Sequence, residues 1–320
     1  MLVIGGNGFL GYHIAKLLED KSVNIGILIR PDDQMQVKYT HNPRIHRIDL
    51  TDATIEELKK ILKDYDMVVF AAGIDDRFTP PKPALDFFRK NNVETTRKVL
   101  TAAAFVGVKR MVVLGSYFAY FARKWPEKRM DLHPYVKSRL EQEELADSPE
   151  AGGVRVVTLE LPYIFGTMTG KTPLWKPLVK YIAKSRVVYY PSGGTTMIAV
   201  DDVAKAVYGA LTVDTPRKTY VIGGKNIGWT DFIKLISKYS GQEDKRVVTL
   251  PNWLVKFGAW ILSLKHLIQG RESGLKVVPF IDIQTAKTYV DETDAQKDLK
   301  YSPGDLYKAI EVTVKECLKE

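Results

Sequence analysis

The chain begins Met1-Leu2-Val3-Ile4-Gly5-Gly6-Asn7-Gly8-Phe9-Leu10-Gly11, an apolar run that leads directly into closely spaced glycines. Residues 2–4 have the composition of a buried parallel strand, and apolar residues recur at helical spacing over residues 9–18. A turn of this kind brings backbone N–H groups and a helix N-terminus close to a pyrophosphate. The pattern therefore predicts a dinucleotide site, with a purely structural strand, turn and helix as the alternative. The expected contacts are Gly5, Gly8, Phe9, Leu10 and Gly11.

Length and composition indicate a globular protein with a large core. The chain has 320 residues, of which 45% are hydrophobic, and this fits one large α/β unit with a smaller lobe. Its formal charge is +9, but Lys and Arg are spread along the chain among nearly as many acids. We therefore expect no nucleic-acid partner, and a basic surface that favours anionic cofactors and substrates.

Cysteine and histidine usage excludes two other kinds of site. Cys317 is the only cysteine, so an intramolecular disulfide is excluded, and no Cys/His spacing suggests zinc. We therefore expect no metal. The first residues show no basic region followed by an apolar stretch and a small-residue cleavage site, so the sequence predicts a cytoplasmic protein.

Strand-like and helical segments alternate along the first half of the chain. This order predicts a Rossmann-type, doubly wound parallel sheet. After Pro162 the rhythm loosens, and Gly193-Gly194 marks a turn. We expect residues 1–165 to form the NAD(P)-binding domain, with 195–225 returning to it, and residues 166–194 and 226–320 to form a smaller, mostly helical substrate-binding lobe. The expected strands are 23–29, 44–48, 67–70, 110–114 and 154–159, and the expected helices are 54–63, 84–105 and 134–146.

Residues 253–268 form the most apolar long segment. They are too few to span a bilayer, and Lys256, Lys265 and His266 interrupt them, so we expect no integral membrane segment. A packed amphipathic helix is the expected structure, and attachment of this helix to a membrane surface is the alternative.

Two motifs later in the chain carry the chemistry. The expected strand at 110–114 is followed by Gly115-Ser116-Tyr117, and Tyr135-Val136-Lys137-Ser138-Arg139 comes 19 positions beyond Ser116. In this order the chain resembles, over nearly its whole length, the extended short-chain dehydrogenase/reductase family, which includes sugar-nucleotide epimerases, dihydroflavonol reductases and 3β-hydroxysteroid dehydrogenases. The resemblance implies that Ser116 and Tyr135 flank a substrate carbonyl or alcohol.

The chain departs from the family pattern at position 139, where Arg replaces the usual Lys. Residues four apart on a helix share a face, so Arg139 can lie beneath Tyr135, lower the pKa of its phenol and reach the nicotinamide ribose. Arg keeps the positive charge but does not release a proton to a relay. The expected catalytic residues are therefore Ser116, Tyr135 and Arg139, and a cofactor-binding protein without turnover is the alternative.

Other positions of the family are matched one at a time. By resemblance, Asp49 and Leu50 contact the adenine, and Ala71, Ala72 and Gly73 form the small-residue turn beneath the adenosine and pyrophosphate. The backbone around Pro162 and Ile164 is expected to run beside the nicotinamide. Asn92 has a structural role within the family, and the acid of Ile198-Ala199-Val200-Asp201-Asp202-Val203-Ala204 is expected to cap a helix.

The second expected strand is followed by Arg30-Pro31-Asp32-Asp33, which bears on the choice of cofactor. An Arg at this place can pair with a 2′-phosphate, so Arg30 favours NADP(H), whereas the two acids leave NAD(H) open. Candidate substrate-binding residues are Arg77, Tyr163 and Arg186, although Arg77 can equally pair with Asp75 or Asp76.

The end of the chain bears on the reaction. Gly270-Arg271-Glu272 and residues 290–303 resemble the ending shared by dihydroflavonol reductase-like and steroid dehydrogenase-like members. This resemblance favours an NAD(P)(H)-dependent oxidoreductase that interconverts a carbonyl and a secondary alcohol. A sugar-nucleotide epimerase or dehydratase that retains NAD(P) is the enzymatic alternative. The resemblance also allows a homodimer, formed through the two helices that precede and contain the catalytic segment.

Overall fold

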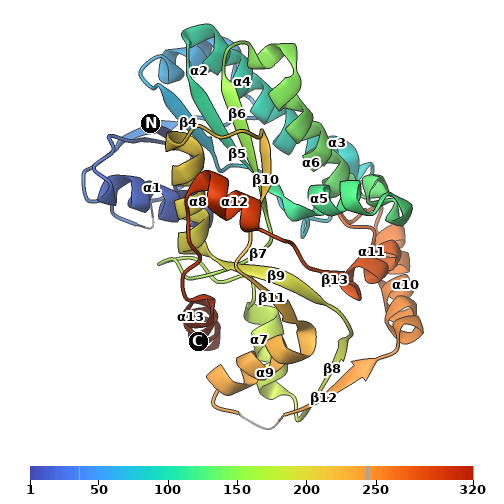
Figure 1. The fold of residues 1–320 in the computed structure, drawn as a ribbon. Helices are drawn as coiled ribbons and strands as arrows, with labels where there is room; N and C mark the ends of the chain where they lie inside the picture. The colour runs from blue at the N-terminus through green and yellow to red at the C-terminus, as the bar shows by residue number, and fades with distance from the viewer. Residues whose placement is uncertain (36, 243–244, 320) are drawn as a thin grey trace.

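The structure is a computed structural model that describes residues 1–35, 37–242 and 245–319. Its centre is a parallel sheet of seven strands in the order β10-β6-β5-β4-β1-β2-β3 (Figure 1). The strand order reverses between β1 and β4, and in open sheets ligands bind at the carboxyl ends of strands at such a point. The predicted Rossmann-type α/β fold is confirmed. The strands are β1 (Leu2–Ile4), β2 (Gly26–Ile29), β3 (Arg44–Arg47), β4 (Met67–Phe70), β5 (Arg110–Ser116), β6 (Arg155–Leu161) and β10 (Thr219–Val221).

Helices cover both faces of this sheet, because successive side chains of each strand enter different cores. Val3 and Val69 pack with α1 (Phe9–Asp20) and α8 (Val200–Thr212) on one face. Leu2, Ile4 and Phe70 pack with α2 (Ile55–Leu62) and α4 (Thr95–Val106) on the other. Burial on both faces explains why the strands read as unbroken apolar runs.

The chain segments before and after β5 form the helices nearest the carboxyl end of this strand. The expected helix 84–105 is observed as α3 (Ala84–Phe88), a π-helical segment Arg89–Glu94, and α4. Helix α5 (Tyr117–Lys124) begins directly after β5, and α6 (Pro134–Glu144) begins with a proline, whose fixed φ suits the first helical position. These bounds place Ser116 at the end of a strand and Tyr135 in the first turn of a helix.

The smaller lobe is built around β9 (Gly194–Ala199). Strand β11 (Lys225–Gly228) pairs antiparallel with β9, while β7 (Tyr163–Phe165) and β13 (Lys287–Thr288) pair parallel with it. Strands β8 (Val187–Pro191) and β12 (Arg246–Leu250) form a separate two-stranded ribbon. A third core joins this lobe to the helices α7 (Lys176–Lys184), α9 (Trp229–Tyr239) and α13 (Leu306–Leu318).

Part of the expected lobe lies against the large sheet instead. Helix α12 (Thr293–Leu299) packs on α8, and Ala295, Leu299 and the following Tyr301 belong to the same core as Val3. The C-terminal segment therefore crosses from the large sheet back to the lobe before α13 (Figure 1).

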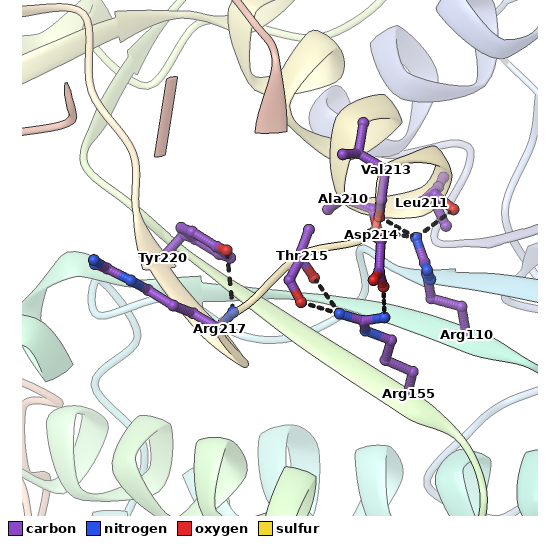
Figure 2. Close-up of polar contacts among 9 residues, drawn as sticks. All are labelled: Arg110, Arg155, Ala210, Leu211, Val213, Asp214, Thr215, Arg217 and Tyr220. Atoms are coloured by element: carbon purple, nitrogen blue, oxygen red, sulfur yellow. Dashed lines mark hydrogen bonds and ion pairs between the residues drawn. The ribbon is translucent and has the colours of Figure 1, made fainter. Parts of the chain in front are cut away.

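Helix α8 is held at both ends by contacts that the sequence did not specify. The expected helix cap is wrong: the N-cap residue is Ala199, and the buried Asp202 accepts a hydrogen bond from Gly304 N–H at 2.8 Å. At the other end, Arg110 donates to the carbonyls of Ala210, Leu211 and Val213, with the last contact at 2.6 Å (Figure 2). These bonds satisfy carbonyls that the helix leaves without an internal partner.

Arg155 anchors the chain that leads from α8 to β10. It forms an ion pair with Asp214 and donates to the carbonyl and hydroxyl of Thr215 (Figure 2). Since Arg110 and Arg155 begin β5 and β6, both act at the amino end of the sheet, away from the predicted cofactor edge.

Helix α10 (Asn252–Ile268) differs from expectation. Only Ala259 is fully buried, so the expected packing of an apolar face into the core is wrong. The helix contacts α11 (Val277–Gln284), and its large apolar side chains lie on the surface. Within the residues that the structure describes, no helix has the length and apolar character needed to cross a bilayer.

The core of the large sheet makes a direct prediction about stability. Phe70 is completely buried in β4, so Phe70→Ala should lower the free energy of unfolding by about 3–5 kcal/mol through lost apolar burial and a cavity. The measurement is urea denaturation followed by circular dichroism. Phe105→Ala, at a side chain that is 73% exposed, is the matched control and should cost less than about 1 kcal/mol. Equal losses in the two variants would contradict the assignment of the core.

Candidate active site

The glycine turn joins β1 to α1 at the centre of the sheet. Gly5 has φ of +87°, a left-handed conformation that glycine adopts without steric penalty. A Cβ built on Gly11 would lie 2.2 Å from the Gly5 carbonyl oxygen, so only glycine lets α1 begin so close to β1. The first turn of α1, which follows Gly8, carries no acidic side chain. Its backbone N–H groups and positive dipole end therefore suit an anion such as a pyrophosphate.

Gly6 and Tyr39 also support this turn, and the sequence analysis had singled out neither. The Tyr39 hydroxyl donates to the Gly6 carbonyl at 2.7 Å. A Cβ on Gly6 would lie 2.3 Å from Ile27 Cγ2, so β2 packs too closely for any side chain there. Gly6 could have been found as part of the glycine run, but no sequence signal connects Tyr39 to it.

The segment after β6 passes over the start of α1. The Thr167 carbonyl lies 2.9 Å from His13 Nε2, and a Cβ on Gly166 would lie 3.3 Å from Phe9 Cζ. Pro162 and Ile164 lie between the carboxyl end of β6 and Gly166, and therefore along the same edge of the sheet as the glycine turn. Their contact with a nicotinamide stays a prediction.

The expected adenine and ribose contacts lie at the ends of β2 and β3. Asp49 accepts hydrogen bonds from Thr51 N–H and Oγ1, both at 2.8 Å. These bonds, the backbone one first, hold the pKa of Asp49 below its ordinary value, and the charge of Arg30 acts in the same direction. Arg30 is exposed directly after β2, and the half-buried Leu50 follows Asp49. Arg30, Asp49 and Leu50 therefore belong to one edge of the sheet, as the sequence predicted.

The loop that leaves β4 is tied to the helices behind it. Ala71 N–H donates to the Ile4 carbonyl at 3.0 Å, which keeps Ala71 and Ala72 beside the glycine turn. The Asn92 side chain forms two hydrogen bonds with the backbone of Ile74: it accepts one from the Ile74 N–H at 2.8 Å and donates one to the Ile74 carbonyl at 3.1 Å. A Cβ on Gly73 would lie 3.1 Å from Asn92 Oδ1, so a small residue is needed between them.

Ser116 and Tyr135 meet at the carboxyl end of β5. Ser116 caps α5, accepting a hydrogen bond from Phe118 N–H at 3.3 Å, and both Ser116 and Tyr135 are buried. Burial raises the pKa of the Tyr135 phenol, and the charge of Asp76 raises it further, while Arg139 and a hydrogen bond with Ser116 oppose this rise. The phenol is therefore protonated at neutral pH.

Arg139 lies one helical turn beyond Tyr135 and faces its ring. Its Cζ is 5.2 Å from the ring centroid. One terminal nitrogen donates to Gln142 Oε1 at 2.7 Å and to the Leu114 carbonyl at 3.3 Å, and the other donates to the Ile74 carbonyl at 3.2 Å. Its Nε is buried and has no hydrogen-bond partner among the described residues. The guanidinium thus connects β5, the loop after β4 and α6 directly beneath Tyr135.

Asp76 is an acidic group of the site that the sequence analysis did not assign. It is half-buried, and burial together with the neighbouring Asp75 raises the pKa of its carboxyl to about 6. Its charge also raises the pKa values of the buried phenols of Tyr117 and Tyr135. The only sequence signal for Asp76 was its position in the loop after β4, at the edge where ligands bind.

The three predicted substrate-binding residues are not gathered in one place. Arg77 is exposed and pairs with Asp75, through Nε to Oδ1 at 2.9 Å, as the alternative interpretation allowed. Tyr163 lies near the site, with its ring 5.9 Å from that of Tyr117. Arg186 is exposed just before β8, at the end of the lobe away from β5 (Figure 1). Contact of any of them with a substrate stays a prediction.

Two carboxylates with little exposure lie behind Arg139, on α6 and β6, and both pair with the exposed Arg123 of α5. Arg123 pairs with Glu143 at 2.5 Å and with Glu160 at 2.6 Å. Burial raises the pKa of both carboxyls, and repulsion from Glu143 adds to this effect at Glu160. One guanidinium thus faces two acids, and protonation of either carboxyl reduces the repulsion between them. The cluster supports the back of α6.

Comparison with known proteins agrees with this geometry. The family model described as "NAD dependent epimerase/dehydratase family" matches residues 1–223. The chain belongs to this family. In known protein structures, the same fold covers nearly the whole chain. The protein gox2253 is 21% identical with a TM-score of 0.77, over 98% of this chain and 96% of its own.

Two further structures of this fold are sugar-nucleotide epimerases. UDP-glucuronic acid 4-epimerase from Bacillus cereus, solved in complex with UDP-glucuronic acid and NAD, is 19% identical with a TM-score of 0.70, over 99% of this chain and 98% of its own. UDP-glucose 4-epimerase from Thermotoga maritima is 15% identical with a TM-score of 0.69, over 98% and 97%. At these identities the likeness concerns the fold. A comparison with curated protein sequences gives no match.

The residues present fit the dinucleotide that the family implies. The turn at Gly5 and Gly11 leaves no room for side chains and presents the N-terminus of α1 to the edge of the sheet. The partnerless Nε of Arg139 is a buried donor near Ser116 and Tyr135. Both features suit a ligand with a pyrophosphate and hydroxyl oxygens. No cluster that could hold a metal ion is found among the described residues.

The raised pKa of Asp76 predicts a pH-dependent stability. Folded Asp76 binds its proton more tightly than an ordinary carboxyl of pKa 3.8 does, so its contribution to stability is complete below about pH 4 and is lost as the pH rises through about 6. Asp76→Asn removes this loss. The difference between the free energy of unfolding of the variant and that of the native chain, both measured with urea, should increase by at most about 3 kcal/mol from pH 4 to pH 7. Asp20→Asn, at an exposed carboxyl, controls for the loss of a charge, and a difference that is the same at every pH would refute the effect.

Proposed function

We propose that the chain is an NAD(P)-dependent enzyme that acts on a secondary alcohol or its carbonyl, in the manner of the sugar-nucleotide epimerases of its family. The convergence of Ser116, Tyr135 and Arg139 at the carboxyl end of β5 carries this proposal. It places a proton donor, a second hydroxyl and a fixed cation on the same sheet edge as the glycine turn.

The chain offers contacts for each part of the cofactor. Gly5, Gly8, Gly11 and the first turn of α1, with Phe9 and Leu10, would hold the pyrophosphate. Asp49 and Leu50 would contact the adenine, Ala71, Ala72 and Gly73 would underlie the adenosine, and Arg139 would bind the nicotinamide ribose. When bound, the nicotinamide supplies or accepts a hydride.

Tyr135 would act as the general acid and base. Its raised pKa keeps the phenol protonated, which suits donation of a proton to a substrate carbonyl oxygen. The guanidinium of Arg139 then stabilises the phenolate, and the Ser116 hydroxyl holds the same substrate oxygen. An epimerase cycle would start from the phenolate, which the raised pKa of Tyr135 makes a minor form of the free enzyme. The phenolate would take the proton of the substrate alcohol, and the resulting phenol would later return it to the carbonyl oxygen. Arg139 contributes charge and position to these steps, while the proton moves only at the Tyr135 oxygen.

A nucleotide sugar is the proposed substrate class. It is supported by the family match and by the whole-chain likeness to enzymes solved with such ligands. Net reduction of a carbonyl is the second candidate, because a protonated Tyr135 is ready for that direction and the chain ending resembles reductases. Stoichiometric consumption of NADPH would favour the reductase, whereas product formation without net cofactor consumption would favour the epimerase.

Tyr135→Phe tests the central role. Turnover should fall by about 10²–10⁴-fold because the proton donor is lost, while cofactor affinity should stay within about twofold because the ring remains. Turnover is measured by mass spectrometry on a panel of nucleotide sugars and carbonyl compounds, and affinity by calorimetric titration. Tyr189→Phe, at an exposed tyrosine, is the matched control. Undiminished turnover in Tyr135→Phe would exclude the proposed proton transfer.

The same assays decide whether the chain binds a cofactor without turnover. Arg139→Lys restores the family residue beneath Tyr135. If neither the native chain nor this variant turns over any compound of the panel while both bind NAD(P)(H), the enzymatic proposal fails and a sensor is supported.

The proposed preference for NADP(H) is tested at Arg30. Arg30→Ala should weaken NADP(H) binding by about 10–100-fold, the range of one charge-assisted hydrogen-bonding contact, and leave NAD(H) binding nearly unchanged. Both affinities are measured by titration of the same preparation. Arg44→Ala, at an exposed residue that begins the neighbouring strand β3, controls for the loss of one cation. Equal losses for the two cofactors would show that Arg30 does not recognise the 2′-phosphate.

A further inference from the structure

The outer surface of α10 is strongly apolar. Nine of the nineteen large apolar side chains exposed in the described part of the chain belong to this one helix. Trp253 is 70% exposed, Trp260 is 50% exposed and Ile268 is 85% exposed. Monomeric soluble proteins rarely leave a contiguous apolar surface of this kind uncovered. We therefore expect this exposed face of the helix to be a binding surface.

The apolar side chains form one continuous arc rather than scattered positions. At about 100° of rotation per residue, eight of them fall within about 140° of the helix circumference. The rings of Phe257 and Trp260 stack within this arc, with centroids 6.0 Å apart. The opposite side, which includes the buried Ala259, faces the protein. The members of the arc are Trp253, Leu254, Phe257, Trp260, Ile261, Leu264, Leu267 and Ile268.

Basic residues border the arc on both sides. The same rotation puts Lys256 next to one edge of the arc and Lys265 next to the other. Helix α10 contains no acidic residue, and residues 251–290 carry five Lys or Arg but only two Asp or Glu. Lys256 pairs with Asp282 at 2.7 Å, whereas Lys265 forms no ion pair within the described residues. The apolar face is thus bordered by lysines on both sides, and the charge of Lys265 is not balanced by an ion pair within the described residues.

We propose that α10 docks the protein on an anionic phospholipid surface. The helix lies along the membrane interface, with its apolar arc among the acyl chains near the headgroups and its lysines at the level of the phosphates. Tryptophan is favoured at this depth because its ring is apolar while its N–H remains hydrated, and lysine stems extend along apolar surface to reach water. The net charge of +9 adds long-range attraction to an anionic leaflet.

A second copy of the chain is the competing occupant. Trp253, Phe257, Trp260, Leu264 and Leu267 follow a 4-3-4-3 spacing that also suits helix pairing. The exposed arc is wider than such a seam, and it extends to Leu254, Ile261 and Ile268. Pairing of two α10 helices would also bring together two copies of Lys265, which has no ion-pair partner within the described residues, whereas Lys256 is balanced by Asp282. An anionic lipid surface accommodates both the width of the apolar arc and the lysine charge.

Docking through α10 would place the loop after β4 near the membrane. The segment that follows α10 is bonded to this loop, from Lys82 N–H to the Gly270 carbonyl at 3.1 Å and from Glu272 N–H to the Pro80 carbonyl at 3.0 Å. Phe78 of the same loop is also exposed. The loop carries Asp76, so the membrane face would adjoin the candidate active site.

Co-sedimentation of the full chain with phospholipid vesicles tests the proposal. The native chain should sediment with vesicles of phosphatidylcholine and phosphatidylglycerol, and less with phosphatidylcholine alone or at high salt. Phe257→Glu combined with Trp260→Glu should reduce binding at least tenfold, because carboxylates enter the apolar arc. Leu174→Glu, at an apolar residue exposed elsewhere, is the matched control. Lys265→Glu should reduce binding several-fold, and Lys180→Glu should not.

Three results would overturn the proposal. The native chain could stay in the supernatant with anionic vesicles, or the double variant could bind as the native chain does. Light scattering without vesicles could show a dimer that the double variant converts to a monomer, which would assign the face to a second copy. Thermal unfolding confirms that each variant is folded, so a failed cofactor or activity assay leaves this test unaffected.

Discussion

The carbonyl oxygen of Ile74 accepts hydrogen bonds from both Asn92 and Arg139, and the site depends on this shared acceptor. Asn92 belongs to the π-helical segment before α4, whereas Arg139 belongs to α6. The two bonds therefore fix the loop after β4 against two separate helices. Because the same loop begins with Ala71, which is bonded to Ile4 at the end of β1, the position of α6 is coupled to the position of the glycine turn. Loss of either bond would move Tyr135 relative to that turn.

Arg at position 139, where the family usually has Lys, is consistent with this role in fixing the loop after β4. An ammonium group has three donors around one point, whereas the guanidinium spreads its donors over a planar fork. Arg139 uses that width to reach the carbonyls of Leu114 and Ile74 and the side chain of Gln142 while remaining beneath the Tyr135 ring. The residue that perturbs the phenol electrostatically is thus also the residue that holds three elements together. Its charge only partly offsets the burial of Tyr135, whose pKa stays raised.

The sequence predicted the sheet well because burial on both faces leaves apolar runs that do not depend on distant contacts. It also placed Ser116, Tyr135 and Arg139 together, since strand ends and helical spacing determine which residues can meet. It did not reveal Asp76, because the charge environment of a loop carboxyl depends on Asp75, Arg77 and Arg139 after folding. The expected cap at Asp202 failed for a similar reason, since its partner, Gly304, is about a hundred positions away. Arg186 was named by residue type alone, and the structure puts it on a different part of the lobe.

Helix α10 shows a further limit of periodicity. A repeating apolar pattern indicates which side of a helix avoids water, but it does not identify what covers that side. In this helix the small side, centred on Ala259, meets the protein, and the broad aromatic side remains exposed. The core does not require that surface, because four separate clusters of buried apolar residues already cover the strands and the other helices. The exposed part of the tryptophan side chains therefore adds little stability to the isolated chain. Their clustering beside lysines is better explained by an external apolar and anionic surface than by folding.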